Sequence, residues 1–436
     1  MSSLPTQQYA AVLHAAKDLR LEQRPLWPPK PNHVQVEVES TGLCGSDLHY
    51  YQHGRNGDFA VRQPLVLGHE AAGVVTAVGA GVTDFVVGQR VAIEAGIMCR
   101  DCKFCKEDRY NLCKSMRFCS SAAAFPHVDG TLQTRMNHPA HVLHPLPANC
   151  SFEKAALAEP LSVLVHASRR AGLTKGHSVL VLGTGAIGIL ACALAKTLGA
   201  SRVAAIDIND ARLDFVKKNG FAQQVFCFPP ADRPQTPEEQ LRRAKDNALT
   251  ALAAFGKEDG FDVVFECSGA ESSIQMSVHV SISISSSMLH LACPIPSSPS
   301  FEPWLSFPTF CSTILICCIT LDLIISYVLG SPQCPREAAM TGGKVMLIGM
   351  GTRNVMLPLS AAALREVDIH GSFRYANTYP TALSLLSSGQ LENIEKLVTH
   401  RFGLQDTRKA FETLARGVDE NGQLVLKIMV GKSYGS

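Results

Sequence analysis

Four cysteines lie close together in the chain, at Cys99, Cys102, Cys105 and Cys113, in the spacing C-x2-C-x2-C-x7-C. Four thiolates spaced in this way can surround one tetrahedral Zn²⁺ ion and leave it no open position, so such a site stabilises the fold and does no chemistry. An iron–sulfur cluster also uses closely spaced cysteines, and four unrelated reduced cysteines are a third interpretation. The spacing favours a structural zinc site.

A second set of candidate metal ligands is spread along the chain. Cys44 opens the stretch CGSDLH, His69 and Glu70 belong to GHE, and Glu159 belongs to AEP. A thiolate, an imidazole and one carboxylate can hold a catalytic Zn²⁺ and leave a position for water or substrate. A cysteine and a histidine twenty-five residues apart are more often structural residues, so the spacing alone leaves both interpretations open.

Three residues beside Cys44 suit supporting roles in such a site. Asp47 could orient the free nitrogen of His69, as carboxylates often do for metal-bound histidines. Ser46 and His49 would offer a hydroxyl and an imidazole for moving a proton outward.

A glycine-rich turn, Gly183–Gly188 (GTGAIG), follows the apolar run at 178–182 and opens a helical stretch. Asp207 ends the next apolar run, nineteen residues after Gly188. This is the context of the dinucleotide fingerprint, in which glycines allow the pyrophosphate to approach a helix N-terminus. Asp207 would accept hydrogen bonds from the ribose and repel a 2′-phosphate, so NAD is favoured over NADP. A glycine-rich turn in some other α/β domain is the alternative.

The elements that must position these residues change character along the chain. Residues 33–41 alternate apolar and polar side chains, and short strand-like runs follow at 73–78 and 89–93, which predicts a β-rich first part. A helix is predicted over 152–170. Beyond residue 178, buried apolar runs alternate with helical stretches, which predicts a doubly wound parallel sheet. We therefore predict an α/β protein with two domains of different architecture, a β-rich domain followed by a domain built on a parallel sheet.

Composition excludes several classes of protein. Lys and Arg number 40 and Asp and Glu 38, a net charge of +2, so nothing draws the chain to nucleic acid or to an anionic membrane. The beginning, MSSLPTQQYA, lacks the pattern of a secretory signal. We therefore expect a cytoplasmic protein whose 15 cysteines are reduced.

One segment, 278–337, fits neither architecture. It is rich in Ser, Pro, Cys and Ile and nearly uncharged, and its run Phe310–Leu329 is long enough to span a bilayer although Asp322 interrupts it. We interpret it as an anomalous insertion, from a retained intron or a gene-model error, since structureless loops of this length are uncommon inside α/β units. A genuine membrane anchor is the alternative.

Together these motifs resemble the zinc-dependent medium-chain dehydrogenases. The stretch from Gly68 to Val82, GHE-x2-G-x5-G-x2-V, matches that family's zinc signature, and CGSDLHYYQHG, CKFCKEDRYNLC, ALAEPLSV and GSFRYANTYP resemble its polyol branch of sorbitol, xylitol and arabinitol dehydrogenases. The resemblance implies a GroES-like catalytic domain at 1–158, a Rossmann NAD-binding domain at 159–371 and a return to the catalytic domain at 372–436. It also implies a homo-oligomer, either a dimer or a tetramer.

The resemblance implies roles for individual residues as well. It assigns the catalytic zinc to Cys44, His69, Glu70 and Glu159, with the division between direct and water-mediated contact left open. Catalytic roles fall to Ser46, His49 and Glu159, and polyol hydroxyls to Tyr50, Phe118, Glu159, Arg374 and Tyr375. NAD contacts fall to Gly183, Gly185, Ile187, Gly188, Asp207, Arg212, Ile348, Gly349, Met350, Ser372, Phe373 and Arg374.

The expected activity is the reversible, NAD-linked and zinc-dependent oxidation of a secondary hydroxyl of a polyol to a ketose. Another zinc alcohol dehydrogenase or a threonine dehydrogenase is the rival of the same class, and the stretch FRYAN favours a hydroxylated substrate over these. An inactive or membrane-anchored protein, produced by the insertion, is the rival of another class.

Overall fold

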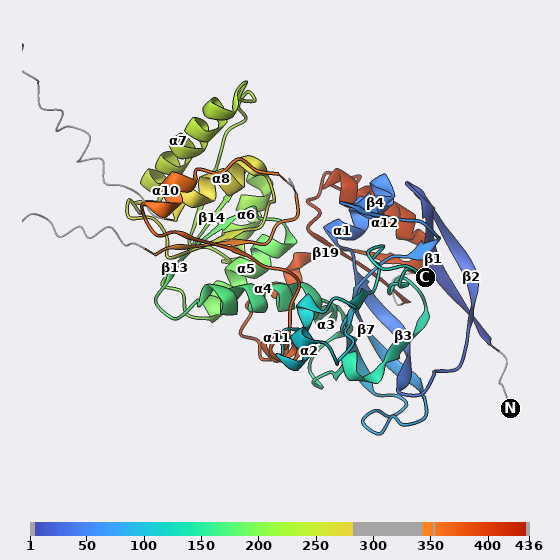
Figure 1. Cartoon of the computed structure of the whole chain (residues 1–436). Coiled ribbons are helices and arrows are strands. Elements are labelled where there is room, and N and C mark those ends of the chain that lie inside the picture. The colour runs from blue at the N-terminus through green and yellow to red at the C-terminus, as the bar shows by residue number, and fades with distance from the viewer. Residues whose placement is uncertain (1–4, 282–341, 352–353, 433–436) are drawn as a thin grey trace, which may run out of the picture.

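We describe a computed structural model of the chain, in which residues 5–281, 342–351 and 354–432 are described. Its elements form two units, each built around one large sheet, as Figure 1 shows. The prediction of an α/β protein that combines a β-rich unit with a parallel-sheet unit is confirmed.

The first unit contains a seven-stranded sheet in the order β12-β8-β7-β3-β20-β19, with β11 also paired to β3. A three-stranded sheet, β2-β1-β6, lies in the same unit. The strands of the two sheets are β1 (Thr6–Ala15), β2 (Asp18–Leu26), β3 (His33–Gly42), β6 (Leu65–Val66), β7 (Glu70–Val78), β8 (Arg90–Ile93), β11 (Arg135–Pro139), β12 (Leu143–Pro145), β19 (Val398–Gly403) and β20 (Lys427–Gly431).

The alternation of β3 explains the core of this unit. Val34, Val36 and Val38 are buried on one face of the strand and pack with Ala71 and Val75 of β7 in a single apolar cluster. Successive side chains of a strand point to opposite faces, so this period-two pattern places every second residue in the core.

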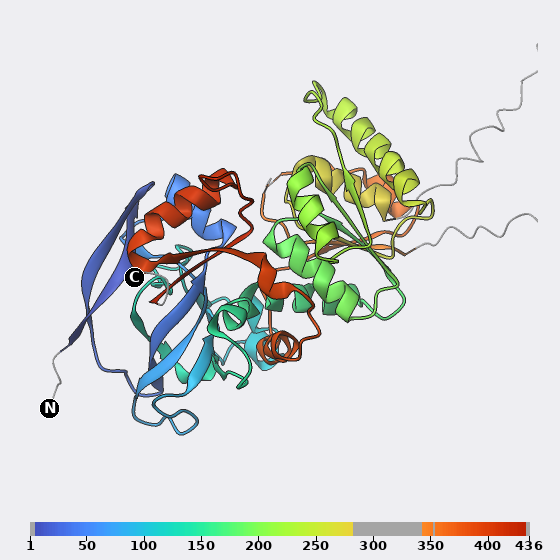
Figure 2. The ribbon, with the colours of Figure 1, turned by 180° about the vertical axis from the view of Figure 1, so that it is seen from behind.

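The C-terminal part of the chain returns to this first sheet. β20 lies antiparallel to β3, with Met429 opposite Gly42, and β19 lies parallel to β20. Two helices lie near these strands, α1 (Gly45–His53) and α12 (Thr407–Arg416), and Figure 2 shows the late segments packed against the early ones from behind. Strands from both ends of the chain therefore share one sheet.

The second unit is a six-stranded parallel sheet in the order β15-β14-β13-β16-β17-β18. Its strands and helices are β13 (Ser178–Leu182), α5 (Ala186–Thr197), β14 (Arg202–Asp207), α6 (Asp210–Lys218), β15 (Gln224–Cys227), α7 (Pro237–Phe255), β16 (Val263–Glu266), α8 (Glu271–Val280), β17 (Lys344–Leu347), α10 (Leu359–Ala363) and β18 (Asp368–Gly371). This order is that of a doubly wound nucleotide-binding sheet, as predicted.

Both faces of the parallel sheet are covered. Val179 and Val181 of β13 pack into an apolar cluster with α5, and the intervening Leu180 and Leu182 pack into another with α7 and α8. A strand buried on both sides needs apolar residues at successive positions, which is why Val179–Leu182 is a continuous apolar run.

The single helix predicted over 152–170 is wrong in one detail. The structure has two helices, α3 (Phe152–Ala156) and α4 (Ala158–Ala171), separated at Leu157. Pro160 lies in the first turn of α4, where its missing N–H is tolerated, whereas inside one continuous helix it would remove a backbone hydrogen bond. α4 contacts both β7 and β17, and it packs on α11 (Tyr379–Ser387) where the two units meet (Figure 1).

The predicted insertion falls mostly outside the described residues. Its first residues, Val278–Val280, belong to α8, in which Val278 and Val280 are buried. The apolar run Phe310–Leu329 lies outside the described part of the chain. Among residues 5–281, 342–351 and 354–432, no helix is both long enough and apolar enough to cross a bilayer.

Candidate metal centre and dinucleotide site

The first sheet brings three of the spread candidate ligands together. The ligand atoms of Cys44, His69 and Glu70 all lie within 4.8 Å of one another. The register of β3 and β7 explains this meeting, since Gly42 pairs with Glu70, the first residue of β7, and Cys44 follows two residues later at the start of α1. A thiolate, an imidazole and a carboxylate at this separation fit one Zn²⁺ ion with an open position.

Asp47 holds His69 as the sequence predicts. Its Oδ1 lies 3.3 Å from Nδ1 of His69, and the same oxygen accepts hydrogen bonds from the Ser120 hydroxyl at 2.5 Å and the Gly68 N–H at 3.1 Å. Burial disfavours an imidazolium, but Asp47 raises the pKa of His69 well above its ordinary value. With Nδ1 facing Asp47, the other ring nitrogen, Nε2, is left for a metal.

Glu70 forms a buried ion pair with Lys427, the first residue of β20. The lysine Nζ also donates to the Leu43 carbonyl at 3.0 Å. Burial opposes the charge on Lys427, yet Glu70, with Cys44 nearby, raises the pKa of Lys427 above its ordinary value. A Cβ at Gly42 would overlap the Glu70 carboxylate, so any larger residue there would displace Glu70 from its present position.

Glu159, in the first turn of α4, stands outside the group formed by Cys44, His69 and Glu70. Its carboxyl is buried beside that group, and burial, reinforced by the Glu70 carboxylate, raises its pKa to about 7 although His69 opposes the shift. A carboxyl with this pKa exchanges a proton near neutral pH. Its role as a direct metal ligand stays a prediction.

Of the predicted proton path, the structure contains the contact between Ser46 and His69. Ser46 Oγ lies 3.5 Å from Nε2 of His69. His49 lies exposed on α1, with its ring centroid 6.1 Å from that of His53. The order Ser46 then His49 therefore runs from the candidate metal group toward solvent.

The residues predicted to hold polyol hydroxyls surround the same region. The Phe118 ring centroid lies 5.6 Å from that of His69, and the Arg374 guanidinium lies 4.1 Å above the Phe118 ring. Phe118 and Arg374 line a cavity of about 270 Å³. Tyr50 is buried, and its hydroxyl accepts a hydrogen bond from the Ala122 N–H at 3.0 Å.

Tyr375 is also buried, and it lies near Glu159. Burial, with Glu159 nearby, raises the pKa of Tyr375 well above its ordinary value, so the phenol stays protonated. A guanidinium and two phenols beside the candidate metal group suit a substrate with several hydroxyls.

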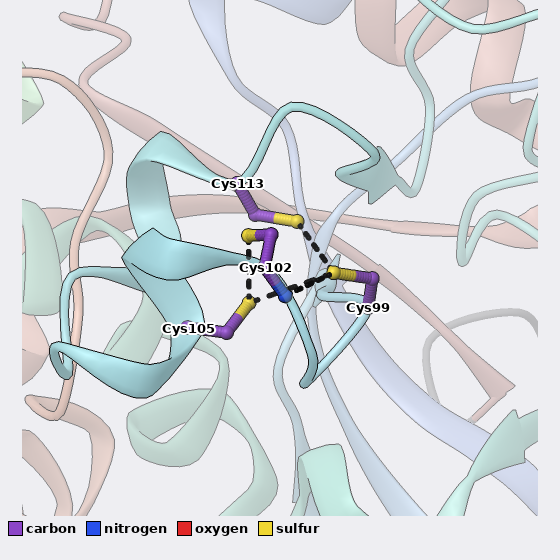
Figure 3. A group of neighbouring side chains, drawn as sticks. All are labelled: Cys99, Cys102, Cys105 and Cys113. Atoms are coloured by element: carbon purple, nitrogen blue, oxygen red, sulfur yellow. Dashed lines mark hydrogen bonds between the residues drawn. The ribbon is translucent and has the colours of Figure 1, made fainter.

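The four closely spaced cysteines converge, as Figure 3 shows. Cys102 caps α2 (Lys103–Lys106), Cys105 lies within that helix, and Cys113 follows the 3-10 turn η1 (Tyr110–Leu112). We refer to residues 99–113 as the cysteine lobe. Sulfur atoms lie 3.5 Å apart for Cys99 and Cys113, 3.6 Å for Cys102 and Cys105, and 3.9 Å for Cys99 and Cys105. Sulfurs bonded to a tetrahedral Zn²⁺ at about 2.3 Å would lie roughly 3.8 Å apart, so the lobe fits a structural zinc.

The environment of the lobe favours thiolate at one position. The backbone N–H groups of Asp101 and Cys102 lower the pKa of Cys99 to about 6. Burial raises the pKa of Cys105 to about 12. Four thiolates at these distances repel one another unless a cation lies between them.

The glycine-rich turn GTGAIG lies between β13 and α5, as predicted. Gly183 has φ of 89°, a left-handed conformation that favours glycine, and a Cβ at Gly188 would overlap the Gly183 carbonyl. Gly185 caps α5, and Ile187 lies in its first turn. The turn therefore has the close helix–strand packing that a dinucleotide site requires.

Asp207 is the last residue of β14 and lies beside this turn. Its carboxylate already accepts hydrogen bonds from other residues of the protein. Oδ2 accepts the Thr184 N–H at 2.6 Å and the Thr184 hydroxyl at 2.8 Å. Oδ1 accepts the N–H groups of Ile208 and Asn209 at 2.7 and 3.1 Å. A ribose would compete with the Thr184 hydroxyl for this carboxylate.

The other predicted cofactor residues follow the carboxyl ends of neighbouring strands. Ile348, Gly349 and Met350 follow β17, and Ser372, Phe373 and Arg374 follow β18. Arg212 lies in the first turn of α6, after β14. Ligands of doubly wound sheets bind at this edge, so the placement suits a cofactor that extends from Asp207 toward Arg374.

The structure also brings in residues that the sequence analysis missed. They are Lys427, paired with Glu70, Ser120, which donates to Asp47, and Tyr110 and Asn111 of the cysteine lobe, which contact the segment that carries Arg374. One signal was available for Lys427, which is the single charge in the apolar run LVLKIMV. The other three have no signal in the sequence.

Comparison with known proteins identifies related families. Residues 30–148 match the family model of the alcohol dehydrogenase GroES-like domain, and residues 186–281 match that of the zinc-binding dehydrogenases. The chain is 38% identical over 423 residues to sorbitol dehydrogenase of Gallus gallus, covering 97% of this chain and 96% of the relative. It is 37% identical over 419 residues to that of Homo sapiens, covering 96% and 94%.

Solved structures share the fold. L-idonate 5-dehydrogenase of Escherichia coli superposes with a TM-score of 0.73 at 26% identity, covering 98% of this chain and 99% of the other. The 2R,3R-butanediol dehydrogenase of Bacillus subtilis superposes with a TM-score of 0.69 at 22% identity, covering 98% and 100%. The second likeness supports the arrangement of the two sheets.

Proposed function

The chain belongs to the zinc-dependent medium-chain dehydrogenases, in their polyol branch, and from this premise we propose that it oxidises a secondary hydroxyl of sorbitol, xylitol or arabinitol to the ketose. It is an NAD-linked oxidoreductase that acts on CH–OH donors, and zinc and NAD are its cofactors. One observation carries the choice of a polyol. The Arg374 guanidinium lies over Phe118, which itself faces His69 of the candidate metal group.

Different residues of the protein would bind the metal, orient its ligands and transfer the proton. When bound, zinc lowers the pKa of the substrate hydroxyl and NAD⁺ accepts the hydride. Asp47 orients His69, and Cys44, His69 and Glu70 would hold the metal. Glu159 is buried beside these residues, so its carboxyl would contact the reacting hydroxyl and take part in the proton transfer.

Other residues would transfer the proton to solvent and bind the rest of the substrate. Ser46 lies beside His69 and would accept a proton that His49 then passes to solvent. Tyr50, Arg374 and Tyr375 would hold the distal hydroxyls of the polyol. A site that hydrogen-bonds hydroxyls discriminates strongly against substrates that lack them.

A steady-state assay tests this function. The purified full chain, supplied with Zn²⁺ and NAD⁺, should form NADH from sorbitol, xylitol or arabinitol, and a chelator should abolish the activity. Butan-2-ol, which has no distal hydroxyl, should give a much lower kcat/KM. Turnover of butan-2-ol or threonine without turnover of any polyol would instead favour the other zinc dehydrogenases.

The domain limits are part of the proposal. We place the catalytic domain at 1–158, the NAD-binding domain at 159–371 and the return to the catalytic domain at 372–436. The pairing of β20 with β3 supports the return, and the parallel order of β13 to β18 supports the middle domain. Limited proteolysis with mass spectrometry would locate the limits.

We also infer a homo-oligomer, as a dimer or tetramer. β18 ends the parallel sheet, and Met350, Leu359 and Leu364 on neighbouring segments are exposed apolar residues. Among the described residues, β18 has a strand partner on one side only, and such an edge strand beside exposed apolar side chains suits pairing with a second copy. Sedimentation analysis would test this state.

We propose a cytoplasmic location. All ten cysteines in the described part of the chain are free, which suits a reducing compartment. Fractionation of the source cells would check this location.

A further inference from the structure

The cysteine lobe does more in this chain than enclose a metal, because it touches the segment that carries Arg374 and Tyr375. The Asn111 side-chain amide donates to the Phe373 carbonyl at 2.9 Å. The Asn377 N–H donates to the Tyr110 hydroxyl at 2.9 Å, and the Asn377 side chain donates to the Asp108 carbonyl at 2.9 Å. Three hydrogen bonds therefore connect the lobe to residues 373–377.

This segment needs such support. Arg374 has φ of 51° and Asn377 has φ of 56°, so two residues that are not glycine lie in the left-handed region. Such conformations cost free energy and persist where the surroundings hold them in place. The hydrogen bonds from the lobe reach the residue before Arg374 and Asn377 itself, so they bracket the strained positions.

The lobe side of this contact is itself firmly held. Tyr110 donates its hydroxyl proton to Glu94 Oε1 at 2.8 Å, and His144 lies 2.7 Å from the other oxygen of Glu94. Asn111 is buried, and the Cys113 N–H donates to the Tyr110 carbonyl at 2.9 Å, which closes the turn that carries both residues. The turn therefore ends on one of the four sulfur ligands.

The lobe and the segment also share the wall of one cavity. Asn111, Leu112 and Cys113 line it together with Phe373 and Arg374. Arg374 is placed over two rings of this wall, 4.1 Å from the centroid of Phe118 and 4.8 Å from that of Phe373. A shift of the segment would move the guanidinium away from the Phe118 ring, which lies outside the segment.

We propose that Tyr110 and Asn111 are positioning residues for polyol recognition, through which the cysteine lobe holds Arg374 in the wall of this cavity and keeps the neighbouring Tyr375 in place. The proposal rests on the proposed function, since it takes Arg374 and Tyr375 as the groups that contact distal hydroxyls. The lobe then sets substrate preference as well as stability.

Substrate specificity provides the test. Tyr110→Phe and Asn111→Ala each remove hydrogen bonds to the segment, and each should raise KM for sorbitol or xylitol roughly two- to tenfold. For butan-2-ol, which has no distal hydroxyl, kcat/KM should change little. Lys103→Ala is the matched control, because Lys103 lies in the same lobe with its side chain 78% exposed, and it should behave as wild type.

A second measurement reports on the segment without activity. Hydrogen–deuterium exchange should rise for residues 372–378 in Tyr110→Phe and Asn111→Ala, and elsewhere should match wild type. Equal loss of kcat/KM on polyols and butan-2-ol, or unchanged exchange at 372–378, would overturn the positioning role. A wild-type protein that oxidises no polyol would instead refute the proposed function, and an Arg374→Met variant that loses both substrates equally would refute the contact with distal hydroxyls.

Discussion

The ion pair between Glu70 and Lys427 allows a sharp quantitative prediction. The side chains of Lys427 and Glu70 are 4% and 1% exposed, so neither charge is solvated by water. Replacing Lys427 with methionine keeps most of the side-chain volume and leaves the Glu70 carboxylate buried without its cation. Removing one partner from such a pair costs about 3–5 kcal/mol of unfolding free energy.

Lys432 provides a matched control a few residues further along the chain. Its Nζ lies 3.0 Å from Glu37 Oε2, but the two side chains are 58% and 22% exposed. An ion pair of this kind contributes about 0–1 kcal/mol, since water and salt screen it. Lys432→Met should therefore cost far less than Lys427→Met.

Equilibrium unfolding in urea, with a chelator present, is the measurement. The double variant Lys427→Met/Glu70→Gln should recover much of the stability lost by Lys427→Met, because the uncompensated charge is gone. Added Zn²⁺ should narrow the difference between Lys427→Met and wild type, since a cation beside Glu70 replaces the lysine charge. The reasoning fails if Lys427→Met costs no more than Lys432→Met, or if the double variant loses the sum of the two single effects.

Four further predictions follow from the site and the fold. Cys99→Ser should lower the bound zinc from two ions per chain to one and lower the unfolding midpoint, and metal analysis that finds one ion in both proteins would remove the structural site. Asp207→Ser with a basic residue added nearby should admit NADP⁺ in an activity assay, whereas a wild type that already uses both cofactors would contradict the role of Asp207. Burial lowers the pKa of His138 to about 4, so between about pH 6.5 and 4 the unfolded state binds more protons than the folded state. On the order of 3 kcal/mol of unfolding free energy should therefore be lost as the pH falls through that window. Urea titrations of His138→Gln should show a flatter dependence on pH. Deleting 282–337, with α8 kept whole, should yield a more soluble and more active protein than the full chain, and equal solubility and turnover would show that the segment is an accommodated loop.

Motifs carried by a short stretch of chain were readable from the sequence. The four cysteines occupy residues 99–113, so chain connectivity alone keeps their sulfurs within reach of one ion. GTGAIG and Asp207 belong to consecutive βαβ elements, whose neighbouring strands bring the glycine turn and the carboxylate together. In both cases the local chain geometry leaves few other arrangements.

Contacts between distant segments needed the tertiary structure. Cys44, His69 and Glu70 meet because the register of β3 and β7 places Gly42 opposite Glu70, and a slip of one residue would turn Glu70 to the other face of the sheet. Lys427 reaches Glu70 only because β20 pairs with β3. Asn111 and Phe373 are 262 residues apart, and their hydrogen bond depends on how the cysteine lobe packs where the two units meet. Strand register and packing are properties of the assembled fold, so the sequence by itself determined which groups are available and the tertiary structure decided which of them act together.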